Sequence, residues 1–342
     1  MSVKSISYSC NSNSRAISQM VTRLIFSAFV CSFLILLTCT RAYAVEKCVF
    51  VIPSVANPYW MTVKQGIEDA GREQKLTCVV LSAASDQAKE EFLNLCQAAI
   101  SQNPAMIVIC TTSDTMTIQC LREAQERRIK VALLDTVIPN EMVRKARINL
   151  SFSVATDNVR IGRSAAQFVA KQNKCSMPKV LILEGVVGNT CNSNRVSGFK
   201  QELMEELPKA KVVNCISAEW DRLRAMNITA DTLTRTSDLN IIFAANDTMA
   251  LGAAEAVRLA GKSDQVMIVG VDGISDARKA ILSGRITASV AQLPYLIGRR
   301  SVELAKESLC GQSNSKNEET PSLVLTKSVL EARTDKLLKY VR

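Results

Sequence analysis

The sequence predicts an α/β protein built from two doubly wound lobes, each with a parallel sheet. After residue 45, short apolar runs alternate with longer amphipathic runs, the pattern of strands joined by crossover helices. Runs such as VLILEG and MIVGVD are apolar on both faces, as expected for strands covered by helices on both sides. About ten strands are too many for one small sheet, so two lobes of about five strands each are expected.

The expected strands and helices alternate along the whole chain. Strands are predicted at residues 47–53, 76–82, 105–110, 130–135, 151–155, 178–184, 211–217, 240–244, 266–271 and 286–291. Helices are predicted at residues 59–73, 87–102, 114–128, 158–172, 193–206, 221–235, 247–261, 275–283 and 294–310. Residues 311–320, GQSNSKNEET, are polar and are expected to form a surface loop. A last strand at 322–326 and a charged tail follow.

The first 44 residues differ in composition from the rest of the chain. An uncharged apolar run over residues 24–38 follows Arg23 and precedes Ala-Tyr-Ala at residues 42–44. A positive flank, an apolar run and an A-x-A cleavage pattern are typical of a secretory signal peptide. The apolar run is short for a membrane span. Residues 1–44 are therefore predicted to be a cleaved signal peptide, and the protein is expected in the periplasm.

Three alternatives for this leader stay open. It could be retained as a membrane anchor, or Cys39 could carry a lipid, although Thr38 is a poor residue before a lipid-bearing cysteine. A start at Met20 would give a leader of more usual length.

Charge and residue usage exclude several classes of function. Removal of the leader lowers the net charge from +10 to +6, and the positive residues are spread without a run of five. No nucleic-acid surface is therefore expected. The chain has no histidine, which excludes Ser-His and Cys-His nucleophile pairs and histidine metal sites. Without CxxC, GxGxxG or the full P-loop pattern GxxxxGK[ST], no zinc, nucleotide or other cofactor is predicted.

Nine cysteines follow the leader, an odd number that cannot pair completely within one chain. Most lie in apolar stretches such as LTCVVL and IVICTT. There they are expected to behave as small buried hydrophobic residues. Their pairing is not predicted.

Polar and aromatic side chains gather just after the predicted strands. In an open parallel sheet, ligands bind beyond the carboxyl ends of the strands. Asp135 and Asp272 end two strands, and both tryptophans of the chain, Trp60 and Trp220, follow two others. A sugar offers hydroxyls to carboxylates, amides and arginines and C–H faces to aromatic rings. The pattern therefore favours a sugar pocket at this edge.

Each of these residues also has a purely structural interpretation. Tyr59 and the two tryptophans could be core residues, and Arg195 could form a local salt bridge. Carboxylates and amides after strands often cap the next helix, and a capping side chain can also face a cleft.

The mature chain resembles the periplasmic sugar-binding proteins of the ribose and allose type, which serve ABC transporters. The resemblance runs from about residue 48 to residue 329. It rests on the stretches ANPYWMTVKQGIEDA, TDNVRIG, EGVVGN, AEWDRLRA, ANDTMALGAAEAV, GVDGISDARKAI and TASVAQLP. AEWDR and NDTMALG resemble the allose-binding branch in particular.

The resemblance implies the type I periplasmic-binding-protein fold, in which two lobes joined by three crossovers close on a sugar. Carried over, the crossovers lie near Thr156-Asp157, near Gln292 and within 317–323. The N-terminal lobe would comprise 45–156 plus 293–320, and the C-terminal lobe 157–292 plus 321–342. The residues implied for the pocket are Asn57, Tyr59, Trp60, Asp135, Asn189, Arg195, Trp220, Asn246, Asp272 and Gln292.

Two positions depart from the family pattern. Pro53 stands where the allose branch carries a lysine, and Thr136 stands where the ribose branch carries an arginine. Compared with each of these two branches, the pocket therefore lacks one positively charged hydrogen-bond donor. The identity of the sugar is not predicted, but a neutral monosaccharide is expected. Cys191 could border the pocket or be a buried structural thiol.

The predicted function is an exported, monomeric solute-binding protein that delivers a monosaccharide to an ABC transporter permease, and not an enzyme. The alternative is a sensing protein whose closed form is presented to a chemoreceptor or sensor kinase. A repressor of the same core fold would need an N-terminal DNA-binding domain, where this sequence has a leader. An enzyme using Asp135 and Asp272 as acid and base has no supporting motif.

Overall fold

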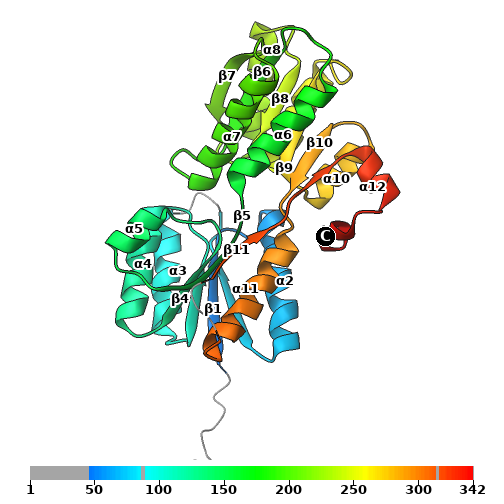
Figure 1. The fold of residues 1–342 in the computed structure, drawn as a ribbon. Coiled ribbons are helices and arrows are strands. Elements are labelled where there is room, and N and C mark those ends of the chain that lie inside the picture. The colour runs from blue at the N-terminus through cyan, green and yellow to red at the C-terminus, as the bar shows by residue number, and fades with distance from the viewer. Residues whose placement is uncertain (1–45, 86–88, 313–315, 342) are drawn as a thin grey trace, which may run out of the picture. The chain divides into compact units, whose positions relative to one another are not determined.

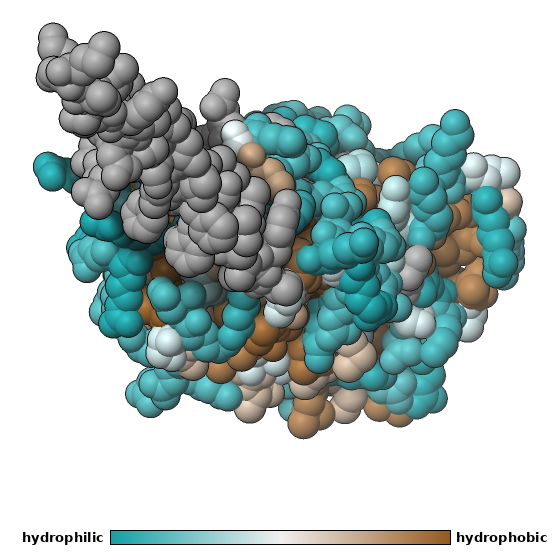
Figure 2. Space-filling view, turned by 90° about the horizontal axis from the view of Figure 1, so that it is seen from below, coloured by the Kyte–Doolittle hydropathy of each residue, from teal (hydrophilic) through white to brown (hydrophobic). Residues whose placement is uncertain are grey.

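The structure is a computed structural model that describes residues 46–85, 89–312 and 316–341. The predicted signal peptide, 1–44, lies outside the described residues. From Lys47 onward, the described residues form one compact unit. None of the helices within the described ranges is long and apolar enough to cross a membrane. The face in Figure 2 is mostly hydrophilic, with hydrophobic residues in small groups.

The first sheet contains six strands in the order β11-β5-β4-β3-β1-β2, and every neighbouring pair is parallel. Its strands are β1 (Lys47–Ile52), β2 (Thr77–Ser82), β3 (Met106–Ile109), β4 (Lys130–Asp135), β5 (Leu150–Thr156) and β11 (Lys316–Thr320). Its helices are α2 (Pro58–Gln74), α3 (Lys89–Ser101), α4 (Asp114–Glu126), α5 (Asn140–Lys145) and α11 (Pro294–Leu309). Helices α2 and α11 cover one face, while α3 and α4 cover the other (Figure 1).

The second sheet also contains six strands, in the order β12-β10-β9-β8-β6-β7. Its strands are β6 (Lys179–Glu184), β7 (Lys211–Ser217), β8 (Ile241–Ala244), β9 (Met267–Asp272), β10 (Ala288–Ala291) and β12 (Leu323–Leu325). Only β12 among them pairs antiparallel, with β10. Its helices are α6 (Asn158–Gln172), α7 (Thr190–Glu206), α8 (Arg222–Arg235), α9 (Asp247–Leu259), α10 (Ser275–Leu282) and α12 (Lys327–Ala332), followed by the 3-10 helix η1 (Lys336–Tyr340).

The buried strands explain why the sequence pattern is so regular. In β1, Phe50 and Ile52 pack under α2 and α11, whereas Val49 and Val51 pack under α3 and α4. All four are fully buried, because a parallel strand covered on both faces has no side open to water. The prediction of two doubly wound parallel-sheet lobes is confirmed.

The chain passes three times between the two sheets. It leaves the first sheet after β5 at Thr156, returns between β10 and α11 at Gln292, and crosses again at residues 321–322 between β11 and β12. The Thr156 and Thr320 hydroxyls hydrogen-bond to each other at 2.9 Å. Two of the crossing segments are therefore tied together at the point where they leave the first sheet.

The prediction of a loop over residues 311–320 is wrong in its second half, since Lys316–Thr320 forms β11 and pairs with β5. This edge strand has polar rather than apolar side chains and is held by polar contacts. Ser153 Oγ donates to Asn317 Oδ1 at 2.8 Å, and Arg300 Nη2 donates to Glu318 Oε2 at 2.6 Å. Apolar periodicity therefore gives no signal for it. The short helices α5, α12 and η1 were not predicted either.

Candidate functional site

A cavity lies where the carboxyl ends of the strands of both sheets meet, and it contains every residue predicted for the site. Its empty volume, including the open mouth, is about 650 Å³. The lining residues are Pro53, Asn57, Tyr59, Trp60, Cys110, Thr111, Thr112, Asp135, Thr136, Val186, Asn189, Cys191, Arg195, Trp220, Asn246, Asp272 and Gln292.

The asparagines at the cavity are helix caps, as their structural interpretation predicted. Asn57 Oδ1 accepts from Tyr59 N at 3.0 Å, and Asn246 Oδ1 accepts from Met249 N at 2.9 Å. Asn189 caps α7 in the same way, accepting from Asn192 N at 3.1 Å. The cap uses the amide oxygen, so at Asn189 and Asn246 the amide NH₂ is the group that a ligand in the cavity would meet.

The first-lobe wall is aromatic and acidic. Tyr59 and Trp60, at the start of α2, pack edge to face with ring centroids 4.9 Å apart, and both are buried. The Tyr59 hydroxyl donates a short hydrogen bond to Asp135 Oδ1. Tyr59 therefore contributes a polar contact as well as an aromatic face.

Burial raises the pKa of the Asp135 carboxyl, while the hydrogen bond from Tyr59 and the charge of Arg195 lower it. The pKa of Tyr59 lies well above its usual value because burial and the Asp135 carboxylate both disfavour a phenolate. The proton of this pair therefore stays on the phenol, and Asp135 acts as the acceptor.

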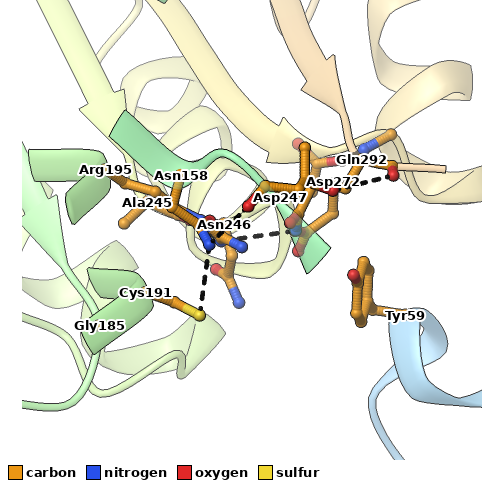
Figure 3. A network of polar contacts seen from close by, with 12 residues as sticks. Tyr59, Asn158, Gly185, Cys191, Arg195, Ala245, Asn246, Asp247, Asp272 and Gln292 are labelled. Carbon is orange, nitrogen blue, oxygen red and sulfur yellow. Dashed lines mark hydrogen bonds and ion pairs between the residues drawn. The ribbon is translucent and has the colours of Figure 1, made fainter. Parts of the chain in front are cut away.

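Arg195, near the start of α7, is the center of the second-lobe network (Figure 3). Its Nε donates to Asn158 Oδ1 at 2.7 Å, and its Nη1 donates to the Ala245 carbonyl at 2.7 Å. Asp272 Oδ1 lies 3.5 Å from the same Nη1. Although burial alone would lower the pKa of Arg195, the Asp272 carboxylate raises it, so this buried guanidinium is charged.

Asp272 and Gln292 form the hinge side of the cavity. Gln292 Nε2 donates to Asp272 Oδ1 at 2.6 Å, which leaves the amide oxygen of Gln292 facing away from that bond. Among the described residues, this oxygen and the Thr112 hydroxyl are buried without a hydrogen-bond partner. Buried polar atoms are rarely left unpaired, so both atoms indicate a place for ligand groups.

Several residues of the site have strained backbone conformations. Asp135, Trp220 and Asp272 have positive φ angles of 65°, 64° and 118°, and Leu293, which follows Gln292, has 61°. Such conformations are unfavourable for residues with a side chain. At a functional site, such a conformation can hold a side chain in the direction that the site requires.

Trp220 forms the second-lobe aromatic wall, and its position depends on Gly185. The Arg195 guanidinium lies 5.8 Å from the centroid of the Trp220 ring. A Cβ at Gly185 would stand only 2.1 Å from Trp220 Cζ2. The indole therefore rests directly on a backbone that carries no side chain.

Asp247 supports the site from behind. It is fully buried, and its carboxylate accepts from Gly273 N at 2.7 Å, Ile274 N at 2.9 Å and Ser289 Oγ at 2.7 Å. These bonds fix the turn after Asp272. The distant partners of Asp247 cannot be recognised from the motif NDTMALG.

The structure also shows where three residues lie whose position relative to the pocket the sequence did not decide. Pro53, Thr136 and Cys191 line the cavity. Burial raises the pKa of the Cys191 thiol to about 12, so it is a neutral group there. Cys110, which also lines the cavity, was interpreted only as a buried hydrophobic residue; its position directly after β3 was the missed signal. All nine cysteines after the predicted leader are free thiols.

The charged side chains that line the cavity are Asp135, Asp272 and Arg195. Within the described ranges, no cluster of histidine, cysteine or acidic residues is suited to hold a metal ion. The arrangement presents hydrogen-bonding groups and two aromatic walls, and is suited to binding a small polar ligand.

Comparison with known proteins agrees with the observed fold. Residues 48–313 match the periplasmic binding protein domain family. The D-allose-binding periplasmic protein of Escherichia coli (strain K12) is 32% identical over 269 residues, covering 79% of this chain and 86% of that protein. The ribose import binding protein RbsB of Haemophilus influenzae is 33% identical over 273 residues, covering 80% and 89%.

A solved structure shares the same architecture. The ABC transporter periplasmic solute binding protein from Actinobacillus succinogenes 130z, with bound D-allose, matches with a TM-score of 0.78 and 25% identity. The match covers 84% of this chain and 99% of that one. The chain belongs to the periplasmic binding protein family.

Gly185→Ala is expected to displace the Trp220 indole, because the new methyl group would overlap the ring. Overpacking of this kind typically lowers the free energy of unfolding by about 1–3 kcal/mol. Chemical unfolding and the tryptophan emission spectrum measure both effects. Val187→Ala is the control, since Val187 is exposed in the same loop and should change neither. An unaltered spectrum and stability in Gly185→Ala would contradict the described packing.

Proposed function

We propose that this protein is exported to the periplasm and captures a neutral, allose- or ribose-like monosaccharide between its two lobes for delivery to an ABC importer. The observation that carries the proposal is the cavity, which combines a buried carboxylate from each lobe with two buried polar atoms that have no partner among the described residues. A ring of hydroxyls can satisfy all of these groups at once.

The proposed ligand contacts come from both lobes. Asp135 and Asp272 accept from hydroxyls, and the Gln292 amide oxygen accepts from a further one. Trp60 and Trp220 supply flat faces for the C–H groups of the sugar ring. Hydrogen bonds to charged groups contribute about 1.5–3 kcal/mol each, so a few of them suffice for tight binding of a small ligand. Asn57, Tyr59, Asn189, Arg195 and Asn246 complete the proposed set.

The charge of the cavity supports a neutral ligand. Arg195 is already engaged by Asn158, Ala245 and Asp272, and the two carboxylates outnumber it. A sugar acid or sugar phosphate would bring a further negative charge beside Asp135 and Asp272, which is unfavourable in a buried site. Pro53 and Thr136 stand on the first-lobe wall in place of cationic side chains, which also disfavours a negatively charged ligand.

The proposed movement is closure of residues 45–156 plus 293–320 on residues 157–292 plus 321–342. The three crossings at Thr156, Gln292 and residues 321–322 would serve as the hinge. The closed form, as a monomer, would then present the surface that the permease recognises.

A sensing role is a second candidate. The solved XylFII-LytSN complex contains a chain that matches with a TM-score of 0.73 and 25% identity over 83% of this chain. By analogy, the closed form could be presented to a membrane sensor or chemoreceptor instead of a permease.

The expected ligand preference can be measured by tryptophan fluorescence. Allose, ribose and related neutral aldoses should change the emission, because both tryptophans line the cavity. Glucuronic acid is the matched control for charge, and it should bind at least about tenfold more weakly than the preferred neutral sugar. A folded protein that responds to no sugar, or that prefers the acid, would refute the proposed ligand class.

Tyr59→Phe should move the pH dependence of sugar binding. The ionised Asp135 carboxylate accepts from ligand hydroxyls, and the Tyr59 hydrogen bond lowers its pKa against the effect of burial. Without the hydroxyl, that pKa rises, so affinity should be lost at a higher pH as the solution is acidified. Calorimetric titrations from about pH 4 to 8 measure the shift.

Tyr295→Phe is the control for this experiment. The Tyr295 hydroxyl also donates to an aspartate, Asp69 Oδ2 at 2.8 Å, but neither residue lines the cavity. Its profile should follow that of the wild type. Identical profiles for Tyr59→Phe and the wild type would argue against a role for Asp135 in binding.

A further inference from the structure

Two side chains that line no part of the cavity join the lobes directly. Thr190 Oγ1, at the start of α7 in the second lobe, donates to Asp114 Oδ2, at the start of α4 in the first lobe, at 2.8 Å. We infer that this Thr190–Asp114 pair, here named the clasp, holds the lobes closed and sets ligand affinity without touching the ligand. The inference about affinity rests on the proposed function.

The clasp lies far from the hinge in both sheets. Helix α4 follows β3, which is separated from the edge strand β11 by β4 and β5. Helix α7 follows β6, which is separated from the edge strand β12 by β8, β9 and β10. A rotation about the crossings moves such distant points most, so the clasp can form only when the lobes are together.

The acceptor of the clasp is held in place within the first lobe. Thr111 Oγ1 donates to the other oxygen, Asp114 Oδ1, at 3.5 Å, and Thr117 Oγ1 donates to Thr111 Oγ1 at 2.9 Å. A carboxylate in the first turn is also favoured by the helix dipole of α4. Asp114 is therefore oriented before closure, which reduces the entropy lost when Thr190 binds it.

A neighbouring contact joins the same two lobes. Thr136 Oγ1 and Cys191 Sγ lie 3.0 Å apart, and Cys191 directly follows Thr190 in sequence. Both residues line the cavity, so their substitution would also alter the proposed pocket. Thr190 and Asp114 do not line the cavity, so substitutions there change lobe closure without changing the ligand contacts.

The energetic consequence follows from the two-state nature of closure. In an open form, the Thr190 hydroxyl and the Asp114 carboxylate would each bond to water. In the closed form they bond to each other, which favours closure by the net strength of one partly exposed hydrogen bond. Ligand affinity scales with the population of the closed form, so loss of the clasp should weaken binding chiefly through faster dissociation.

Contacts near the hinge are not expected to act in this way. Arg160 of α6 and Glu319 of β11 also come from different lobes, with Nη1 and Oε1 2.7 Å apart. Arg160 and Glu319 stand close to the crossings at residues 156 and 321–322, where closure moves the chain little. This ion pair can persist in both forms and so cannot favour either.

The test compares Thr190→Val, which keeps the shape but removes the hydroxyl, with Thr190→Ser, which keeps the hydroxyl. Thr190→Val should raise the dissociation constant for the preferred neutral sugar about three- to tenfold, mostly through the dissociation rate measured by stopped-flow fluorescence. Thr190→Ser should remain within about twofold of the wild type. Unfolding curves verify that both variants are folded.

A double-mutant cycle with Asp114→Ala assigns the effect to the pair. If the clasp acts as inferred, Thr190→Val adds little to the weakening already caused by Asp114→Ala. Fully additive effects, or wild-type affinity in Thr190→Val, would overturn the inference.

Small-angle scattering of the ligand-free protein separates this inference from the proposed function. If the wild type binds none of the sugars, the proposed function fails. The clasp then predicts that Thr190→Val has a larger radius of gyration than the wild type and Thr190→Ser. Equal radii in that case would overturn the clasp as well.

Discussion

The site depends on one constraint: ionisable groups buried between two sheets must be paired by groups from several chain segments. Asp135 and Asp272 are 4% and 6% exposed, and a buried charge without partners is strongly unfavourable. The Tyr59 hydroxyl donates a hydrogen bond to Asp135. Asp272 forms an ion pair with Arg195 and accepts a hydrogen bond from Gln292. The Thr112 hydroxyl and the Gln292 amide oxygen, which are buried without a hydrogen-bond partner among the described residues, belong to side chains that line the same cavity.

The fold supplies these groups because both sheets direct their carboxyl ends to the same place. There, short segments follow the strands in strained conformations, including positive φ at Asp135 and Asp272. The buried Asp247 carboxylate fixes the turn after Asp272 through three hydrogen bonds. The hydrophobic core thus holds the strands rigidly, and the segments at the strand ends direct the side chains toward the cavity.

Much of this could be predicted from the sequence, because strand and helix periodicity locates the strand ends and residue type then indicates chemistry. Asp135, Trp220 and Asp272 were found in this way, and all line the cavity. Strand β11 escaped because its polar side chains are held by Arg300 and Ser153 rather than by apolar packing. Contacts between distant segments, such as Thr190 with Asp114, leave no local pattern and required the structure.

The most direct test of the proposed sugar site is a crystal structure of the protein with the neutral monosaccharide that binds it most tightly. We expect the sugar to be enclosed between the lobes, with its ring between Trp60 and Trp220. Its hydroxyls should donate to Asp135, Asp272 and the amide oxygen of Gln292. A sugar bound elsewhere on the molecule, or one contacted by a single lobe only, would contradict it.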